Sequence, residues 1–441
     1  MDFIAKQLPI SYADVVKKDL VVSPIETQYT HARKKTQIHL YKQSDDLFIV
    51  PRFWDPEVPN ISDDVSVVPK TDPEEEINTE FKGELRENQV SICNDIRHIL
   101  RENKGVILSL PCGFGKTIIA INLITKLKLK TLVIVNKSFL MNQWKENLEK
   151  FSTSKVGMIQ QKVIDTQGKD VVIGMLQSLS SRSYPESLFD QFDFVIVDEV
   201  HNIATQSFSK ALFKIRARYT LGLSATPERK DGLSKVFKWF LGTTVYVLKE
   251  CKKHTVQIHC HKYRNQSKKE DRLFQSKLLW NGNLNISSML TNISASESRN
   301  LFITRIIASI LEDDRRNVLV LSSRISQLEN LRQKCTTCPT GMYIGKMKKE
   351  ELKLAEQAQL IFSTYEMVSE GFDLPKLNCI VFATPRSNVQ QSVGRILRRV
   401  DPNTKPIIVD ICDMDLGVFI GQHNKRMNFY KKHLDIELSN V

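Results

Sequence analysis

The sequence predicts an α/β protein with two tandem blocks of parallel sheet and a small β-rich module before them. Short, nearly continuous runs of Val, Ile and Leu alternate with amphipathic stretches over residues 81–246 and again over residues 298–441. Strands that are apolar along their whole length are typical of parallel sheets with helices on both faces. The chain has 441 residues, a length that roughly two to four domains would account for.

The N-terminal region, residues 1–80, has a different composition from the rest of the chain. Residues 37–41 alternate between polar and apolar side chains as a strand does, and residues 46–50 predict a second strand that stops at Pro51. Four prolines and several acidic residues follow in the stretch 55–73, which is typical of a linker. We therefore expect an accessory module and then a connector that ends near Glu80.

The two blocks account for most of the expected elements. In the first block we expect strands at 105–110, 131–135, 170–174, 192–197 and 219–224, with helices at 118–128 and 138–150. In the second block we expect strands at 317–321, 359–362, 379–382 and 406–409, with helices at 299–311 and 325–334. The pattern weakens over 247–297, which is rich in Lys, Asn and Ser and which we interpret as a basic connector.

Charge favours a polyanionic partner. The chain has 63 Lys and Arg against 50 Asp and Glu, a net charge of +13, and an excess of this size most often accompanies nucleic-acid binding. A basic surface without such a partner remains the alternative. The longest apolar runs are far shorter than the ~18 residues of a membrane span, and the N-terminus does not resemble a signal peptide. We expect an intracellular protein without a membrane partner.

The cysteines favour a reducing compartment. Eight are spread over the chain, as expected for free thiols. Cys335 and Cys338 have CxxC spacing, but no second pair completes a zinc site. We interpret these two residues as buried or loop thiols rather than as zinc ligands.

A glycine-rich turn between a predicted strand and a predicted helix resembles a phosphate-binding loop. Its backbone N–H groups would face the phosphates of ATP, Lys116 would reach the β- and γ-phosphates, and the Thr117 hydroxyl would coordinate Mg²⁺. Leu110 occupies a position where the full pattern has Gly, so an ordinary glycine turn is the alternative. If the loop binds ATP, we expect the nucleotide to contact Pro111, Cys112, Gly113, Phe114, Gly115, Lys116 and Thr117.

Two acidic residues follow another predicted strand of the same block. The apolar run 194–197 ends at Asp198 and Glu199, and the carboxyl ends of strands are where ligands bind in open α/β sheets. We expect Asp198 to hold Mg²⁺ and Glu199 to orient and deprotonate the attacking water. A pair of acids after a strand is by itself often a solvated turn. Together with the phosphate-binding loop, the pair predicts ATP hydrolysis.

Seven ordered motifs, from about residue 81 to 415, resemble those of superfamily 2 helicases and translocases. The resemblance implies two RecA-like domains, at 81–246 and 298–441, with ATP bound between them. The motifs are Leu85–Gln89, Leu110–Thr117, Leu132–Trp144 with Gly174–Leu179, Asp198-Glu-Val-His201, Ser224-Ala-Thr226-Pro, Ser363–Pro375 and Gln391–Arg398.

The resemblance also implies roles for single residues. Arg86 and Gln89 would contact adenine, whereas His201, Ser224, Thr226, Gly371 and Asp373 would couple the nucleotide to the nucleic-acid path. Arg395 and Arg398 are three residues apart and share a helix face, so either can act as an arginine finger on the γ-phosphate. Gln391 lies on nearly the same face and would contact phosphate or water. The alternatives are a basic helix that binds nucleic acid, and a helix cap formed by Ser224 and Thr226.

Leu110–Thr117, the Asp198–His201 box and Gly222–Gly232 are most similar to the XPB-like branch of this superfamily. Within that branch the chain, including Leu47–Trp54, resembles compact viral helicases of the poxvirus transcript-release and phage UvsW-like types. Relatives in this branch mostly act on DNA and move 3′ to 5′, and work with transcription or replication machinery. One departure is Lys230, where XPB-type proteins have the Glu of an Arg-Glu-Asp motif. The reversed charge puts in doubt the role of that motif in opening duplex DNA.

Three other functions are consistent with parts of the sequence. An RNA helicase would have the same Asp-Glu-x-His box, a degenerate scaffold would have lost residues that are present here, and a small-molecule NTPase would ignore polynucleotides. The basic stretches at 33–35 and 252–269 either contact nucleic acid or form a solvated surface. The sequence leaves open the pathway, the oligomeric state and the compartment, which would be the nucleus or nucleoid, or the host cytoplasm or virion for a viral protein.

Overall fold

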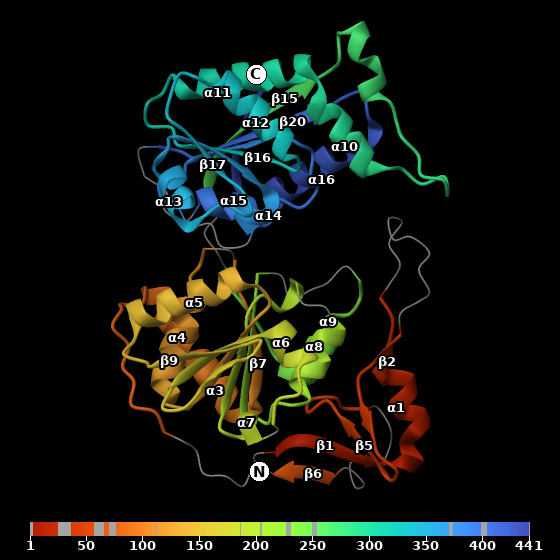
Figure 1. The fold of residues 1–441 in the computed structure, drawn as a ribbon, viewed down its shortest axis with the longest axis vertical. Coiled ribbons are helices and arrows are strands. Elements are labelled where there is room, and N and C mark those ends of the chain that lie inside the picture. Colours follow the sequence, from red (N-terminus) through yellow and green to blue (C-terminus); the bar gives the residue numbers. More distant parts are fainter. Residues whose placement is uncertain are drawn as a thin grey trace. The chain divides into compact units, whose positions relative to one another are not determined.

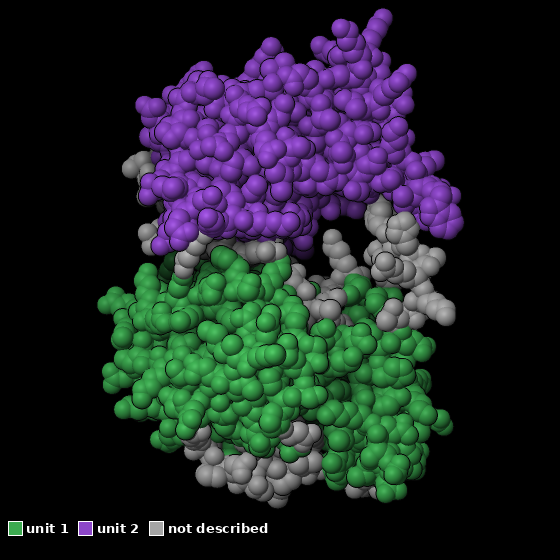
Figure 2. Space-filling model, in the orientation of Figure 1, with its two compact units in different colours: residues 1–249 green, residues 250–441 purple. Residues whose placement is uncertain are grey.

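A computed structural model describes most of the chain. The described residues are 3–24, 37–56, 66–69, 76–111, 113–185, 187–202, 205–225, 231–248, 254–369, 374–397 and 404–440. The chain divides into two compact units, Met1–Lys249 and Glu250–Val441 (Figure 2). Within the described part, no helix combines the length and the apolar character that crossing a membrane requires.

The first unit is built on an eight-stranded sheet in the order β10-β9-β11-β8-β12-β13-β7-β14. All of its neighbouring strands are parallel except the edge pair β9 and β10. The strands are β7 (Gly105–Ser109), β8 (Thr131–Val135), β9 (Val156–Gln160), β10 (Val163–Asp165), β11 (Val171–Met175), β12 (Phe194–Val197), β13 (Tyr219–Ser224) and β14 (Val245–Val247).

Helices cover both faces of this sheet (Figure 1). One apolar core joins α3, α4 and α5 to the sheet through Ile96, Ile119 and Val133, and a second joins α6, α8 and α9 through Phe208 and Leu132. Neighbouring positions along β8 therefore enter different cores, as the pleat requires. The helices are α3 (Glu87–Asn103), α4 (Lys116–Leu127), α5 (Ser138–Phe151), α6 (Leu176–Ser181), α7 (Ser187–Asp190), η2 (Val200–Asn202), α8 (Thr205–Leu212) and α9 (Ser234–Leu241).

The N-terminal module packs onto the first sheet domain and belongs to the same compact unit. It has a four-stranded antiparallel sheet, β4-β5-β1-β6, and a two-stranded one, β2-β3. Strand β6 of this module lies inside the stretch 55–73, which we expected to be a linker. The elements are β1 (Phe3–Pro9), η1 (Ile10–Tyr12), α1 (Ala13–Leu20), β2 (Val21–Val22), β3 (Ile38–His39), β4 (Lys42–Gln43), β5 (Leu47–Val50) and β6 (Ser66–Pro69).

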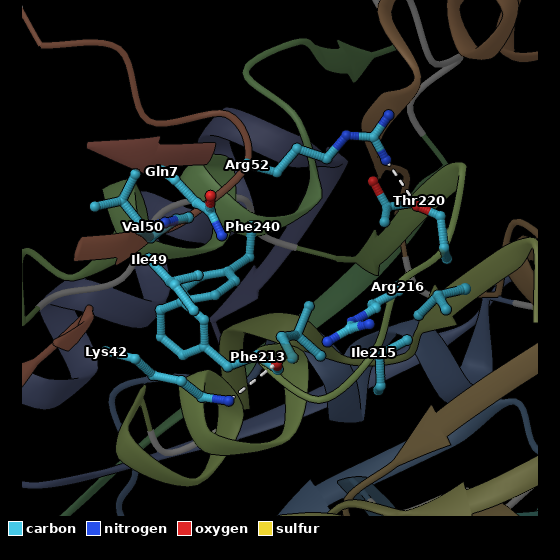
Figure 3. Close-up of a pocket in the computed structure, with 14 residues that line it drawn as sticks. Gln7, Lys42, Ile49, Val50, Arg52, Phe213, Ile215, Arg216, Thr220 and Phe240 are labelled. Carbon is cyan, nitrogen blue, oxygen red and sulfur yellow. Dashed lines mark hydrogen bonds between the residues drawn. The ribbon is translucent and has the colours of Figure 1, made fainter. Parts of the chain in front are cut away.

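Apolar contacts and hydrogen bonds hold this module in place. Phe48 and Trp54 are buried in the same core as Phe208, and the guanidinium of Arg52 donates hydrogen bonds of 2.8 Å to the carbonyls of Ala217 and Arg218. A cavity of about 190 Å³ remains between the module and the sheet domain (Figure 3). The β-rich character predicted for residues 1–80 is thus confirmed, but these residues extend the core of the first block.

The second unit is built on a seven-stranded, entirely parallel sheet in the order β17-β18-β16-β19-β20-β15-β21. Its strands are β15 (Thr255–Tyr263), β16 (Val318–Ser322), β17 (Thr340–Tyr343), β18 (Leu360–Thr364), β19 (Cys379–Phe382), β20 (Ile407–Asp413) and β21 (Asp435–Asn440). The helices are η3 (Lys268–Phe274), α10 (Ile286–Ala295), α11 (Glu297–Leu311), α12 (Ile325–Lys334), α13 (Lys349–Gln357), α14 (Tyr365–Ser369), α15 (Gln390–Ile396) and α16 (Gly417–His433).

The predicted fold class, two parallel-sheet domains with a small N-terminal sheet, is confirmed. The prediction of a connector over 247–297 needs correction, because β15 lies between β20 and β21 in the second sheet. Polar residues such as Gln257 and His259 interrupt the apolar pattern of this strand, and His259 is only partly buried. For that reason the segment did not have the uniformly apolar composition expected of an inner parallel strand.

Candidate nucleotide-binding site

The turn between β7 and α4 has the backbone geometry of a phosphate-binding loop. Gly113 and Gly115 have φ angles of +81° and +94°, in the left-handed region that only glycine adopts easily. A Cβ atom on Gly115 would lie 2.5 Å from Nε2 of Gln89. Helix α4 begins at Lys116, so its unpaired N–H groups face the turn. Cys112 lies outside the described residues.

Side chains on both sides of the turn are tied to its backbone. The ammonium group of Lys116 donates to the carbonyl of Leu110 at 3.1 Å and to that of Pro111 at 3.5 Å. Gln89, near the start of α3, donates from Nε2 to the carbonyl of Phe114 at 2.8 Å, while its Oε1 accepts from the N–H of Arg86 at 3.0 Å. The structure therefore brings Arg86 and Gln89 to the turn.

The two predicted acidic residues lie just beyond β12, at the same edge of the sheet. Asp198 is buried, and its Oδ1 accepts from the N–H of Glu199 at 2.9 Å. Glu199 has a φ angle of +49°, which is rare for a residue with a side chain. Strained backbone of this kind is found preferentially at functional sites. Strand β13 separates β12 from β7 in the sheet, so the acids and the turn lie two strands apart.

Trp144 on α5 is a site residue that the sequence analysis missed. Its side chain is buried in the core of the first unit. However, its indole N–H also donates a 2.8 Å hydrogen bond to Oδ2 of Asp198. Burial and the neighbouring charge of Glu199 raise the pKa of Asp198 to about 6, while the bond from Trp144 and the charge of Lys116 oppose the rise. No local pattern in the sequence indicates this contact.

His201 connects the acidic motif to the end of β13. Its Nδ1 lies 3.0 Å from Oγ of Ser224 and 3.4 Å from Oε2 of Glu199. The N–H of Leu110, at the start of the glycine-rich turn, donates to the carbonyl of Ser224 at 3.1 Å. His201 and Ser224, two of the expected coupling residues, are therefore in contact. Thr226 lies outside the described residues.

The oxygen atoms of this edge fit a magnesium ion with a bound phosphate chain. Mg²⁺ prefers oxygen ligands, keeps several water molecules and usually takes only one or two protein carboxylates. Thr117 supplies a hydroxyl in the first turn of α4, and Asp198 supplies a carboxylate that accepts one hydrogen bond on each oxygen. A carboxylate oxygen has two acceptor positions, so both oxygens retain one.

The predicted residues of the second unit lie on α15 and on segments that the structure does not describe. Gln391 and Arg395 are four residues apart on α15 and therefore share a helix face. Arg395 is buried, with 8% of its surface exposed. Gly371, Asp373 and Arg398 lie outside the described residues.

The two cysteines with CxxC spacing lie at the end of α12. Burial raises the pKa of Cys335 to about 11, which keeps this thiol protonated at neutral pH. In the described part of the chain, no group of three His, Cys, Asp or Glu side chains is placed to hold a metal ion.

Comparisons with known proteins agree with this geometry. The family model of the type III restriction enzyme res subunit matches residues 82–229. L396 of Acanthamoeba polyphaga mimivirus, which is named as an ATP-dependent RNA helicase, is 33% identical over 435 residues, which cover 95% of this chain and 81% of L396. The chain belongs to the superfamily 2 helicases. Helicase 161L of invertebrate iridescent virus 6 is 31% identical over 383 residues, covering 81% of this chain and 83% of 161L.

A solved structure of T4 UvsW is 19% identical in sequence to this helicase. The match covers 77% of the helicase and 74% of the UvsW chain, with a TM-score of 0.33. As a member of this family, the helicase is an ATP-hydrolysing enzyme whose activity depends on nucleic acid.

Proposed function

We propose that this helicase is a Mg²⁺-dependent DNA helicase or translocase of the XPB-like branch. The observation that supports the proposal is the convergence of three strand ends. The glycine-rich turn after β7, Asp198 and Glu199 after β12, and Ser224 at the end of β13 lie at one edge of the first sheet. The ATP-binding domain is 81–246. The C-terminal domain consists of residues 298–441 together with strand β15, which lies in the same sheet.

In this proposal the first unit activates and positions the reactants. The turn holds the phosphates on backbone N–H groups, and Lys116 leaves the carbonyl of Leu110 for a phosphate oxygen. Thr117 and Asp198 would hold Mg²⁺, which would neutralise phosphate charge. Glu199 orients the attacking water and accepts its proton. Its Oε2 accepts no hydrogen bond among the described residues, with Nδ1 of His201 3.4 Å away, and so is available for this role.

The second unit completes the site with positive charge. Arg395 acts as the arginine finger that stabilises the charge of the transition state, with Arg398 as a second candidate and Gln391 as a phosphate or water contact. Gly371 and Asp373 relay the state of the γ-phosphate to nucleic acid. In the first unit, the contact between His201 and Ser224 does so, together with Thr226.

We expect DNA, rather than RNA, to be the nucleic acid along which the helicase moves. The net charge of +13 supports a polyanion, and the resemblance to the XPB-like and UvsW-like types supports DNA in transcript release, recombination or repair. RNA is the second candidate, since L396 is named as an RNA helicase. The similarity to viral proteins supports a helicase that acts in a virus-infected cell, in the nucleus, the cytoplasm or the virion.

Steady-state ATPase assays with Mg²⁺ test this proposal. The rate is compared without polynucleotide, with single-stranded DNA, with forked duplex DNA and with RNA, and Glu199→Gln is the inactive control. We expect strong stimulation by DNA that the variant loses. Stimulation by RNA alone would overturn the DNA assignment. A rate that no polynucleotide changes would overturn the helicase mechanism.

A further inference from the structure

The second unit presents one aromatic side chain almost entirely to solvent. Trp280 is 93% exposed, the highest value among the large apolar side chains that the structure describes. The other three tryptophans, Trp54, Trp144 and Trp239, are buried or partly buried. Indole buries a large apolar surface wherever it finds a partner, so a tryptophan exposed to this extent indicates a binding role more strongly than an exposed Leu does.

The loop that carries Trp280 has a defined hydrogen-bonded structure. It is a tight hairpin in which Leu278 and Leu284 form an antiparallel bridge. The N–H of Gly282 donates to the carbonyl of Leu279 at 2.9 Å, and the N–H of Leu279 donates to the carbonyl of Asn283 at 2.7 Å. Gly282 has a φ angle of +80°. These bonds close the turn around Trp280 and hold its side chain outward.

The hairpin is anchored at both ends. The N–H of Asn285 donates to the carbonyl of Lys277 at 2.7 Å, and the Asn285 side chain caps α10 by accepting from the N–H of Ser288 at 3.0 Å. On the other side, Glu270 of η3 accepts from the hydroxyl of Ser296 at 2.7 Å, at the start of α11. The segment between η3 and α10 projects from the body of the second unit (Figure 1).

The charges around the hairpin favour a polyanion. Residues 272–296 contain Arg272 and Lys277 but no acidic residue. Lys268 and Lys269 precede them, and all four cations are exposed. Two acids lie among these cations, Glu270, which accepts hydrogen bonds at the start of α11, and Asp271, which accepts one from Asn265 at 2.7 Å. Four cations against two acids leave a positive excess over residues 268–296.

From this placement we propose that Trp280 is a stacking platform for an unpaired base of the nucleic acid on which the helicase acts. The inference rests on the proposed function. The cations hold the phosphate backbone, and the indole takes the face of one base, which is the combination that proteins use for single strands. Stacking is tolerant of base identity and of the sugar, so both DNA and RNA strands fit this site.

Binding of oligonucleotides by the full-length protein tests this inference. Fluorescence anisotropy gives the Kd for labelled single-stranded DNA and RNA at fixed salt. We expect Trp280→Ala to weaken binding by about 5-fold to 150-fold, the range that corresponds to ~1–3 kcal/mol per stacked base. Trp280→Phe should retain most of the affinity. Leu278→Ala, which removes a 63%-exposed apolar side chain from the same hairpin, should bind as the wild type does.

A second readout separates stacking from electrostatic attraction. Stacking quenches indole fluorescence, and Trp280 is the most exposed of the four tryptophans. An oligonucleotide with bases should quench the wild type but not Trp280→Phe, and an abasic oligonucleotide of equal length should quench neither. Equal quenching by the abasic strand would overturn the inference.

The outcomes also distinguish this inference from the proposed function. A wild-type protein that binds no oligonucleotide would overturn both. Wild-type binding that Trp280→Ala leaves unchanged would overturn the stacking platform and leave the proposed function standing.

Discussion

The indole N–H of Trp144 donates a 2.8 Å hydrogen bond to Oδ2 of Asp198, 54 residues further along the chain. The bond leaves the carboxylate one preferred orientation at the end of β12, with Oδ1 held by the N–H of Glu199. A helix on one face of the sheet therefore sets the direction of an acid at its carboxyl edge.

Replacement of Trp144 by Phe should lower ATP turnover about 10-fold to 100-fold. The ring keeps most of its packing, but the donor is lost, and hydrogen bonds to charged groups contribute ~1.5–3 kcal/mol. The kcat at saturating Mg²⁺ is the measurement. Trp54→Phe, at the other fully buried tryptophan of this unit, is the control and should turn over normally. A folded Trp144→Phe variant with normal kcat would contradict the role of this bond.

Replacement of Ser224 by Ala should reduce stimulation of the ATPase by polynucleotide several-fold. The change removes the hydroxyl that lies 3.0 Å from Nδ1 of His201, and with it this side-chain contact between the acidic motif and β13. The ratio of stimulated to unstimulated rate is the measurement. Ser209→Ala, which removes another buried hydroxyl of the same unit, should leave that ratio unchanged. Equal ratios in both variants would argue against coupling through Ser224.

Replacement of Gly115 by Ala should weaken ATP binding more than 10-fold. The residue has a φ angle of +94° and its new Cβ would press on the amide of Gln89. Gly168→Ala is a matched control: its φ angle is +66° and no atom lies within 4 Å of the new Cβ. Both variants incur backbone strain of ~1–3 kcal/mol, which thermal unfolding reports. Only Gly115→Ala should lose affinity in calorimetry, and equal affinities would contradict our assignment of the loop.

Replacement of Arg395 by Ala should lower kcat by about 10³-fold with a smaller effect on the affinity for ATP. An arginine finger stabilises charge that develops only in the transition state, and its loss has effects of about this size. Single-turnover hydrolysis and nucleotide binding, measured separately, check the prediction. If Arg395→Ala instead weakened only the binding of nucleic acid, that result would support a basic helix that contacts the nucleic acid.

Acid should destabilise the second unit through Asp410. Burial alone would raise the pKa of Asp410, but the hydrogen bonds from Arg426, at 2.6 and 2.7 Å, and the contact with His423 bring it below its ordinary value. Since the pKa is lower in the folded state, this stabilisation is complete above about pH 4 and is lost as the pH falls further. Calorimetry of the full chain between pH 2 and pH 7 is the measurement.

Asp410→Asn is the corresponding variant. It leaves the charge of Arg426 buried without its acid, which costs about 3–5 kcal/mol, and it should remove the acid-dependent component from the unfolding of the second unit. Asp314→Asn is the control, because that side chain is exposed and surface substitutions change stability little. A similar effect of both variants would contradict the role of the buried pair.

Local pattern predicted which residues of the first unit lie together at the carboxyl edge of its sheet. The glycines of the turn, Lys116 and the two acids follow apolar strands directly, and parallel strands bring their carboxyl ends to one edge. Adjacency in the chain thus becomes adjacency in space. His201 and Ser224 were both expected at this edge for the same reason, but only the structure, in which β12 and β13 are neighbours, shows that the two side chains are in contact.

Features that depend on distant segments were not predictable in this way. β15 pairs with β20 about 150 residues later in the chain, and its polar residues concealed it. The N-terminal module looked separate because its composition differs, yet Trp54 is buried against the first sheet domain. Residue spacing also gives no information on the direction in which a single side chain points. The bond from Trp144 to Asp198 and the exposure of Trp280 both depend on that direction.

The amino-acid pattern was thus sufficient for the fold class, the family and the order of the nucleotide-binding motifs, since these depend on hydrophobic period and on residues next to one another in the chain. Tertiary packing alone decided which polar groups lie in contact, which strands complete each sheet and which aromatic side chain stays in solvent. The physical reason is that burial and hydrogen bonding are properties of pairs, and the partners of Trp144 and β15 lie 54 and about 150 residues away in the sequence.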